Sequence, residues 1–151
     1  MKQNEVAILP MASCHVLQIA SLEQLCFSDP WSETSIGSEL SNPLSLWLVA
    51  MDKDMVAGYI GSQTVMDETD LMNVAVAPGY RRQGIAQALL TELEKRLRAN
   101  GVRCVSLEVR DSNIAAICLY EKLGYVQVGC RRGYYRKPRE DARILRKEWK
   151  L

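Results

Sequence analysis

The chain has 151 residues and carries 19 Lys and Arg against 18 Asp and Glu, which leaves a formal net charge of +1. Hydrophobic residues make up 48% and charged residues 25%, close to the average for globular proteins, and this excludes disordered, collagen-like and fibrous classes. The balanced charge argues against DNA binding as the main task, because domains that grip a phosphate backbone usually carry a basic excess. This length fits one domain, which we expect to span residues 1–151.

The cysteine and hydropathy patterns argue against two further classes, metal-binding and membrane-spanning proteins. The five cysteines contain no C-x-x-C pair and the chain has a single histidine, so we expect no metal site. No apolar run approaches the ~18 residues that a membrane span needs, and no charged leader precedes an apolar stretch at the N-terminus. We therefore expect a protein without a membrane segment, located in the reducing cytoplasm.

In the first half of the chain, apolar spacing predicts a strand, two helices and three more strands. Val16, Ile19, Leu22 and Leu25 recur close to helical spacing and should form one apolar face, and Ser32 can cap a second, shorter helix. The β-rich runs are bounded by turn-forming residues, and an acidic loop at residues 67–70 precedes the last of them. The expected elements are a strand at residues 5–10, helices at 12–26 and 32–40, and strands at 44–51, 55–66 and 71–77.

A long amphipathic helix dominates the second half. Ile85, Leu89, Leu93 and Leu97 recur every fourth residue, and the Asn-Gly pair at residues 100–101 ends the helix. We then expect a strand at residues 102–109, a helix at 113–123, and antiparallel strands at 125–135 and 143–149 joined across 137–141. Strand, helix and strand in succession imply a parallel crossover within a mixed sheet.

The segment between the strand at 71–77 and the long helix is a candidate anion site. The first turn of a helix leaves about four backbone N–H groups unpaired, and the helix dipole adds partial positive charge there. Gly84 and Ala86 keep side chains out of the way, and Arg81 and Arg82 supply cations, so a pyrophosphate fits. The segment is neither a Walker loop nor a full dinucleotide-binding motif. The alternative is an ordinary turn with solvated arginines.

Two motifs resemble those of the GCN5-related N-acetyltransferase (GNAT) superfamily. Arg81, Gly84 and Ala86, placed after a strand and at the start of a long helix, resemble its acetyl-CoA motif. A second superfamily signature is recognisable in Asn113, Ala116, Leu119, Tyr120, Gly124 and Tyr125. The order of the expected elements matches the superfamily over nearly the whole chain.

Within the superfamily, the chain is most similar to the RimI type, the ribosomal-protein alanine N-acetyltransferases. This likeness is carried by Asp-Pro-Trp-Ser at residues 29–32, Leu-Glu-Val-Arg at 107–110, Tyr-Tyr at 134–135 and Arg-Glu-Asp-Ala at 139–142. The resemblance implies an α/β, GNAT-like single domain. Its mixed, mostly antiparallel sheet would be splayed at its centre and flanked by about four helices.

The same resemblance implies acetyl-CoA as co-substrate. Backbone groups of Val74, Ala75 and Val76 would meet the acetyl group and the pantetheine arm, and a backbone N–H near Val76 would stabilise the oxyanion. Asn113 would donate to the pantetheine arm, although capping the following helix is the simpler role for it. The expected pyrophosphate site comprises Arg81, Arg82, Gln83, Gly84, Ile85, Ala86 and Gln87.

Glu108 and Tyr120 are the expected catalytic pair. Glu108 matches the position of the catalytic Glu in RimI-type enzymes, where it would act as general base directly or through a water. Without that likeness, a solvated glutamate on a strand is the simpler interpretation. Tyr120 would act as general acid because a phenol keeps its proton at neutral pH. The alternative for Tyr120 is packing against Leu119 and Tyr125.

Aromatic residues and a run of cations have two interpretations each. Trp31, Tyr134 and Tyr135 would line a peptide groove in the RimI type, but core packing explains aromatic residues equally well. The cations near Arg131 and Arg136 form a basic patch that could contact ribosomal RNA or the adenosine phosphate, and the sequence assigns it to neither.

The sequence thus predicts transfer of acetyl from acetyl-CoA to the N-terminal α-amine of a protein, an alanine of a small-subunit ribosomal protein in the RimI type. Direct attack in a ternary complex is favoured over an acyl-enzyme, because no cysteine has an evident histidine partner. Two alternatives stay open. One is a small-molecule acceptor such as a polyamine or an aminoglycoside, and the other is a non-catalytic module that binds acyl-CoA.

Overall fold

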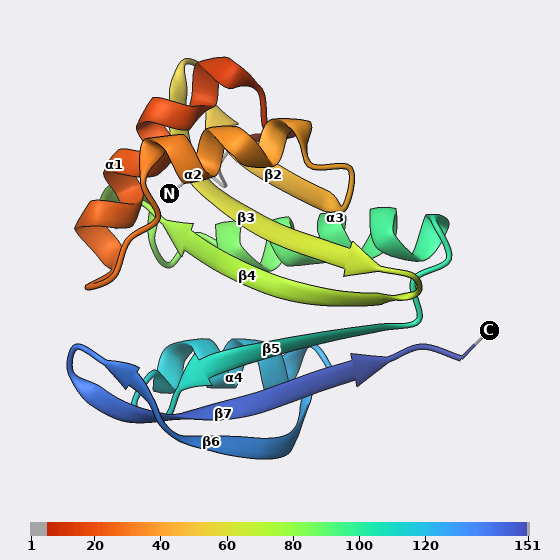
Figure 1. Cartoon of the computed structure of the whole chain (residues 1–151). Helices are drawn as coiled ribbons and strands as arrows, with labels where there is room; N and C mark the ends of the chain where they lie inside the picture. Colours follow the sequence, from red (N-terminus) through yellow and green to blue (C-terminus); the bar gives the residue numbers. More distant parts are fainter. Residues whose placement is uncertain (1–5, 151) are drawn as a thin grey trace.

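The apolar runs form a mixed sheet with helices on both faces, and the computed structural model describes residues 6–150 (Figure 1). The strands are β1 (Ala7–Pro10), β2 (Ser45–Asp52), β3 (Met55–Val65), β4 (Glu68–Val76), β5 (Cys104–Arg110), β6 (Val126–Arg136) and β7 (Arg139–Glu148). The helices are α1 (Val16–Cys26), α2 (Glu33–Ser38), α3 (Ile85–Ala99) and α4 (Ile114–Lys122). The α/β class is confirmed; residue 5 of the first expected strand lies outside the described residues.

A helical crossover lies at the centre of this sheet. The strand order is β1-β2-β3-β4-β5-β7-β6. Strands β4 and β5 run parallel and are joined through α3, whereas the other neighbouring pairs in the described part of the chain are antiparallel. The predicted parallel crossover in a mostly antiparallel sheet is therefore confirmed.

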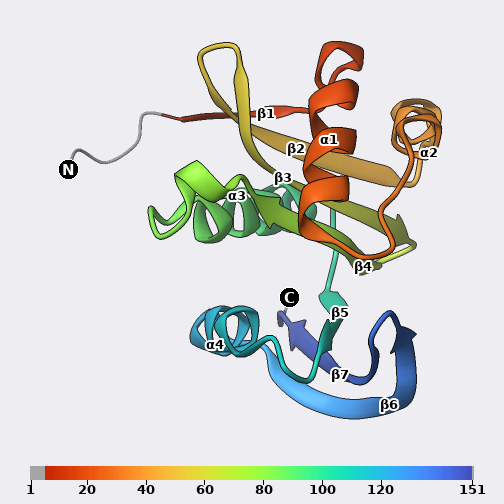
Figure 2. The same ribbon diagram turned by 90° about the vertical axis from the view of Figure 1, so that its left-hand side faces the viewer.

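The helices divide between the two faces of the sheet. Figure 2 shows α1 and α2 on one side, and α3 and α4 on the other. Leu89 and Leu93 of α3 share one core with Leu107 of β5 and Ile117 of α4, whereas α1 packs in a second core on the opposite face. Within residues 6–150, α1 and α2 lie over the β2–β4 half only. The face of β5–β7 turned away from α4 is therefore left without a helix.

The sheet opens between β4 and β5. Their pairing covers only residues 68–70 with residues 104–106, although both strands continue beyond it. Met72 is an extra residue in β4, because Leu71 pairs with Ser62 and Asn73 with Gly61. Such a bulge bends a strand and increases its twist. It lies where β4 leaves β5, so the expected splay at the centre of the sheet is confirmed.

Two expected loops are strands instead. Residues 68–70 belong to β4, because their backbone pairs with β3 on one side and with β5 on the other, which leaves a turn at Met66 and Asp67. Thr69 is buried there, and its hydroxyl lies 2.7 Å from that of Thr64. Strand β7 begins at Arg139 rather than residue 143, so the β6–β7 turn is shorter than 137–141. In both places the backbone ladder forms despite polar side chains, since its hydrogen bonds involve main-chain groups alone. None of the described helices is long and apolar enough to cross a membrane.

A close contact beside the bulge gives a stability prediction. The Cβ of an alanine at position 61 would clash with Cε2 of Trp47, whose ring is stacked on Tyr59 and cannot move away freely. We expect Gly61→Ala to lower the free energy of unfolding by about 1–3 kcal/mol, measured by urea denaturation. Gly79→Ala is the matched control, since no atom lies within 4 Å of its added Cβ. Equal midpoints for the two variants would contradict the assigned packing.

Candidate active site

The edge of β4 at residues 73–76, here called the open edge, presents backbone groups to the gap. The Ala77 N–H donates to the Ala57 carbonyl at 2.8 Å, which fixes the hydrogen-bonding phase with β3. In an antiparallel pair, successive residues of one strand direct their backbone N–H and C=O groups alternately toward the partner strand and away from it. Ala75 therefore turns its backbone groups toward β3, whereas Val74 and Val76 turn theirs toward the gap. Such unpaired N–H and C=O groups can pair with an extended ligand that carries amides.

The start of α3 has the geometry that an anion site requires. Gly84 adopts φ +78° at the N-cap, where no side chain caps the helix. The first helical bond runs from the Ala88 N–H to the Gly84 carbonyl, at 3.0 Å. Within residues 6–150, the N–H groups of Ile85, Ala86 and Gln87 therefore have no partner. A Cβ at Gly84 would meet nothing within 4 Å, so the space above this turn is open.

The two arginines before this helix differ in what they contact. Arg82 is exposed and forms no salt bridge or hydrogen bond with the described residues, so it is available to an anion. Arg81 instead donates from Nε to the Val76 carbonyl at 3.1 Å and from Nη2 to Cys26 Sγ at 3.5 Å. It braces the end of β4 against α1, a role that the sequence did not indicate. Gln87 Oε1 accepts from Lys122 Nζ of α4 at 3.4 Å.

Glu108 lies on the face of β5–β7 that carries no helix, which we call the acceptor face. Its Oε2 accepts from Arg131 Nε at 2.8 Å and its Oε1 from the Tyr134 hydroxyl at 3.3 Å, both from β6. The ion pair is partly exposed, so it contributes little to stability, but it fixes the direction of the carboxylate. Burial, and then Glu108, raise the pKa of Tyr134.

Tyr120 reaches the site from α4, on the opposite side of the sheet. Its side chain is 5% exposed and its ring centroid lies 5.7 Å from that of Tyr125. Burial raises the pKa of its phenol, and the neighbouring Tyr135 raises it further. The Tyr120 hydroxyl has no hydrogen-bond partner among the described residues. Every fully buried side-chain oxygen or nitrogen in that part of the chain has a partner, so this hydroxyl is not fully buried. The hydroxyl is therefore the accessible tip of a buried side chain.

Other expected site residues have structural contacts. Asn113 caps α4 by accepting from the Ala116 N–H at 3.2 Å, which is the simpler of its two interpretations. Trp31 packs edge-on against Trp47, with ring centroids 5.4 Å apart. Tyr134 is 48% exposed on the acceptor face.

A segment between α1 and α2 reaches across the gap. We call residues 27–31 the bridge segment. Within it, the Ser28 hydroxyl donates to the Lys137 carbonyl at the β6–β7 turn. Arg110 of β5 donates from Nη2 to the same carbonyl at 3.1 Å and lies 4.2 Å from the ring centroid of Tyr135. The two halves of the sheet are thus in contact beside the acceptor face as well as at residues 68–70.

Glu23 of α1 is a polar residue to which the sequence pattern assigned no role. It is fully buried, and its oxygens accept from the Trp31 N–H at 2.9 Å, from Asn73 Nδ2 at 2.7 Å and from the Tyr59 hydroxyl. Burial and the bond to Glu23 raise the pKa of Tyr59. The signal was its spacing: Glu23 follows Ile19 by four residues and so shares the buried face of α1.

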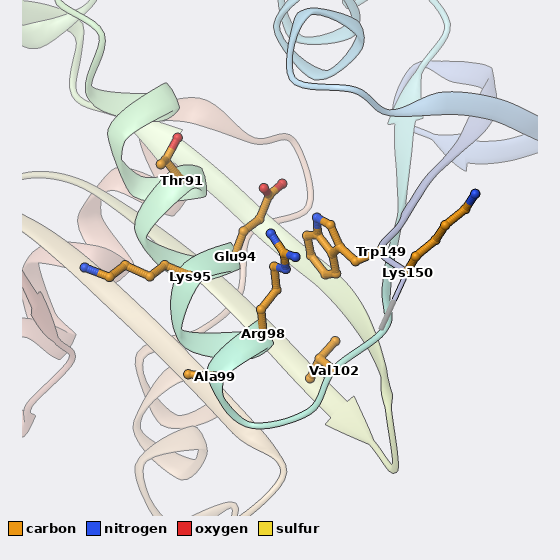
Figure 3. Close-up of a pocket in the computed structure, with 8 residues that line it drawn as sticks. All are labelled: Thr91, Glu94, Lys95, Arg98, Ala99, Val102, Trp149 and Lys150. Atoms are coloured by element: carbon orange, nitrogen blue, oxygen red, sulfur yellow. The ribbon is translucent and has the colours of Figure 1, made fainter.

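A separate hollow of about 640 Å³ lies at the C-terminal end of α3 (Figure 3). Its Arg98 guanidinium lies 5.2 Å from the ring centroid of Trp149, and its Glu94 accepts from Lys147 and from Tyr125. These groups are engaged with one another, at the end of α3 far from Gly84. In residues 6–150, no three His, Cys, Asp or Glu side chains lie close enough to hold a metal ion.

Comparisons with known proteins agree with this geometry. The model of the Acetyltransferase (GNAT) family matches residues 16–125. The ribosomal protein bS18-alanine N-acetyltransferase of Escherichia coli K12 is 42% identical over 126 residues, which cover 82% of this chain and 84% of that protein. The enzyme of the same name from Haemophilus influenzae is 34% identical over 142 residues, covering 91% and 95%. The crystal structure of the E. coli enzyme matches with a TM-score of 0.89 at 36% identity and covers 97% of this chain and 95% of that one.

The affinity for coenzyme A tells the two ends of α3 apart. We expect Arg82→Ala to weaken coenzyme A binding about tenfold in calorimetry, because it removes a charge-assisted contact to phosphate. Arg98→Ala, in the hollow of Figure 3, is the control and should leave the affinity unchanged. Loss of affinity in Arg98→Ala alone would place the anion in the hollow instead.

Proposed function

This chain belongs to the acetyltransferase (GNAT) family, and on that basis we propose that it acetylates the N-terminal alanine of a small-subunit ribosomal protein, bS18. Acetyl-CoA is the acetyl donor. The proposal is carried by one observation: backbone groups of Val74 and Val76 open onto the gap on the strand that leads to the unpaired N–H groups of α3. Relatives that cover most of this chain bear the name of that reaction.

In this proposal, acetyl-CoA lies along the open edge. Its pyrophosphate accepts hydrogen bonds from the first N–H groups of α3, with Arg82 as countercharge. Amide groups of its pantetheine arm pair with the backbone of Val74, in the manner of an added strand. Arg81 occupies the Val76 carbonyl, which leaves the Val76 N–H for the thioester oxygen. Negative charge develops on that oxygen in the tetrahedral intermediate, where a fixed donor stabilises it most.

The acceptor amine approaches from the acceptor face. Glu108 takes a proton from the α-ammonium group, directly or through a water. The ordinary pKa of such an amine is about 7.7–8.0, so a weak base is enough to deprotonate it near neutral pH. Glu108 passes that proton to solvent, and the free amine attacks the thioester carbon. The nitrogen, positively charged after the attack, loses its second proton to the Glu108 carboxylate or to water, and the C–S bond breaks as the amide forms.

Tyr120 protonates the departing thiolate from the α4 side. Its raised pKa means that the phenol still holds the proton to be transferred beyond about pH 10, the ordinary tyrosine value. Solvent returns the proton to the phenolate. The products are the coenzyme A thiol and the acetylated N-terminus, formed in a ternary complex without an acyl-enzyme.

We extend the proposal to the whole chain and its location. Residues 1–151 act as one catalytic domain, since the elements that build the site run from α1 to β7. The acceptor places the reaction in the cytoplasm, where ribosomal proteins are made. Arg131 of the basic patch acts on Glu108 rather than on RNA, since their ion pair is already formed.

The function is tested by incubating the protein with acetyl-CoA and a panel of N-terminal peptides and small amines, with products read by mass spectrometry. We expect an added acetyl group on peptides that begin with alanine. Products from polyamines or aminoglycosides alone would favour a small-molecule acceptor. Binding of acetyl-CoA with no release of coenzyme A on any acceptor would favour a non-catalytic module. Glu108→Gln, run in parallel, should yield at least about tenfold less peptide product.

Tyr120→Phe tests the general acid. It keeps the packing and removes the proton donor, so we expect kcat to fall by about 10²-fold while acetyl-CoA affinity stays within error. Tyr125→Phe is the matched control, because its hydroxyl binds Glu94 at 2.7 Å and takes no part in the reaction. An unchanged kcat in Tyr120→Phe would remove Tyr120 from its assigned role.

A further inference from the structure

Glu23 is a buried carboxylate that none of the steps above uses. Burying such a charge is costly unless hydrogen bonds satisfy it. Within residues 6–150 no cation pairs with it, but three elements supply donors: the Trp31 N–H before α2, Asn73 Nδ2 of β4 and the Tyr59 hydroxyl of β3. One carboxylate therefore joins α1 to the bridge segment and to two strands.

Asn73 connects this carboxylate to the donor side of the site. It directly precedes Val74, so its bond to Glu23 ties α1 to the open edge. A second connection lies one turn further along α1, where Arg81 donates hydrogen bonds both to Cys26 Sγ and to the Val76 carbonyl. The last turn of α1 is thus held against the segment of β4 that receives acetyl-CoA.

Trp31 connects the same carboxylate to the acceptor side. It ends the bridge segment, whose Ser28 donates to the Lys137 carbonyl and lies 3.5 Å from Arg110 Nη2. Arg110 follows Glu108 by two residues on β5, so both side chains lie on the acceptor face. The bridge segment therefore runs from the buried carboxylate to the face where the peptide N-terminus enters.

We propose that Glu23 is a positioning residue for the acceptor peptide. It holds the Trp31 amide and the Asn73 side chain on one carboxylate, and this sets the spacing between the bridge segment and the open edge. The inference rests on the proposed function, since it concerns the acceptor of that reaction. Glu23 touches no substrate, so its loss weakens peptide binding more than it slows the chemistry of a bound acceptor.

Two substitutions at this position test the proposal. Glu23→Leu has a similar size but no acceptor atoms, so all three donors lose their partner. We expect the KM for an alanine-starting peptide to rise about tenfold, with kcat changed less than about threefold and acetyl-CoA affinity unchanged. Glu23→Gln should restore most of the peptide affinity, because its amide can accept from Trp31 and donate to a turned Asn73.

Glu39→Leu is the matched control. Glu39 is also buried and accepts from Asn42, Ser45, Trp47 and Gln63, so its loss destabilises the same side of the sheet. None of these donors lies in the bridge segment, and the peptide KM should stay unchanged. Alaninamide is the control acceptor: it is too short to reach the bridge segment, so its rate should be equal in Glu23→Leu and the unmodified protein.

Hydrogen exchange of the Trp31 amide gives a readout besides activity. We expect faster exchange in Glu23→Leu and no change in Glu39→Leu. An unchanged peptide KM in folded Glu23→Leu, or an equal loss in Glu39→Leu, would overturn the proposal. If Glu23→Leu does not fold, Asn73→Ala and Tyr59→Phe each remove one donor and should raise the peptide KM by a smaller factor. Absence of peptide product from the unmodified protein would overturn the proposed function. Exchange of the Trp31 amide would still show whether Glu23 holds the bridge segment in place.

Discussion

Parallel strands β4 and β5 pair over residues 68–70 and then separate, and the active site depends on that separation. Backbone groups in the middle of a sheet normally satisfy one another. Here Val74 and Val76 pair with β3 on one side, but next to the bulge at Met72 their backbone groups on the gap side have no strand partner in the described part of the chain. The gap therefore offers hydrogen bonds that an extended thioester can complete, next to the unpaired N–H groups of α3.

In the proposed function, the gap also explains why the two catalytic groups come from opposite faces of the sheet. Glu108 points to the acceptor face, whereas Tyr120 comes from α4 on the other face, and only an opening through the sheet lets both reach one thioester. The structure keeps the halves aligned with the α3–α4 core and with the contact of Ser28 with the β6–β7 turn. Glu23 adds a third constraint, since it relates the bridge segment to the open edge.

Much of this arrangement is predictable because it is local in sequence. The four-residue apolar period located α3, and Gly84 with the residues after it predicts an anion site at the start of that helix. The splay followed from the resemblance to the GNAT superfamily, not from periodicity. Where local polarity was the only guide, the prediction was wrong: residues 68–70 and 139–142 are strand, because backbone pairing with distant segments decides their state.

The rest of the site depends on long-range contacts that a single sequence does not reveal. The alternation of side chains along β5 placed Glu108 on the face opposite Leu107, but it did not show what surrounds Glu108 there. Its surroundings are set by Arg131 and Tyr134, which lie more than twenty residues away in the sequence. Glu23 escaped prediction for the same reason, since Tyr59 and Asn73 are 36 and 50 residues from it. Arg81 was expected to bind phosphate, yet its guanidinium contacts Val76 and Cys26.

Backbone amide chemical shifts, recorded by NMR while acetyl-CoA is added, test the central claim most directly. If the thioester completes the open edge and the pyrophosphate caps α3, the largest changes fall on the amides of Val74, Val76 and residues 85–87, and those around Trp149 stay still. Shifts concentrated around Trp149, with the amides of Val74 and Val76 unmoved, would contradict the account.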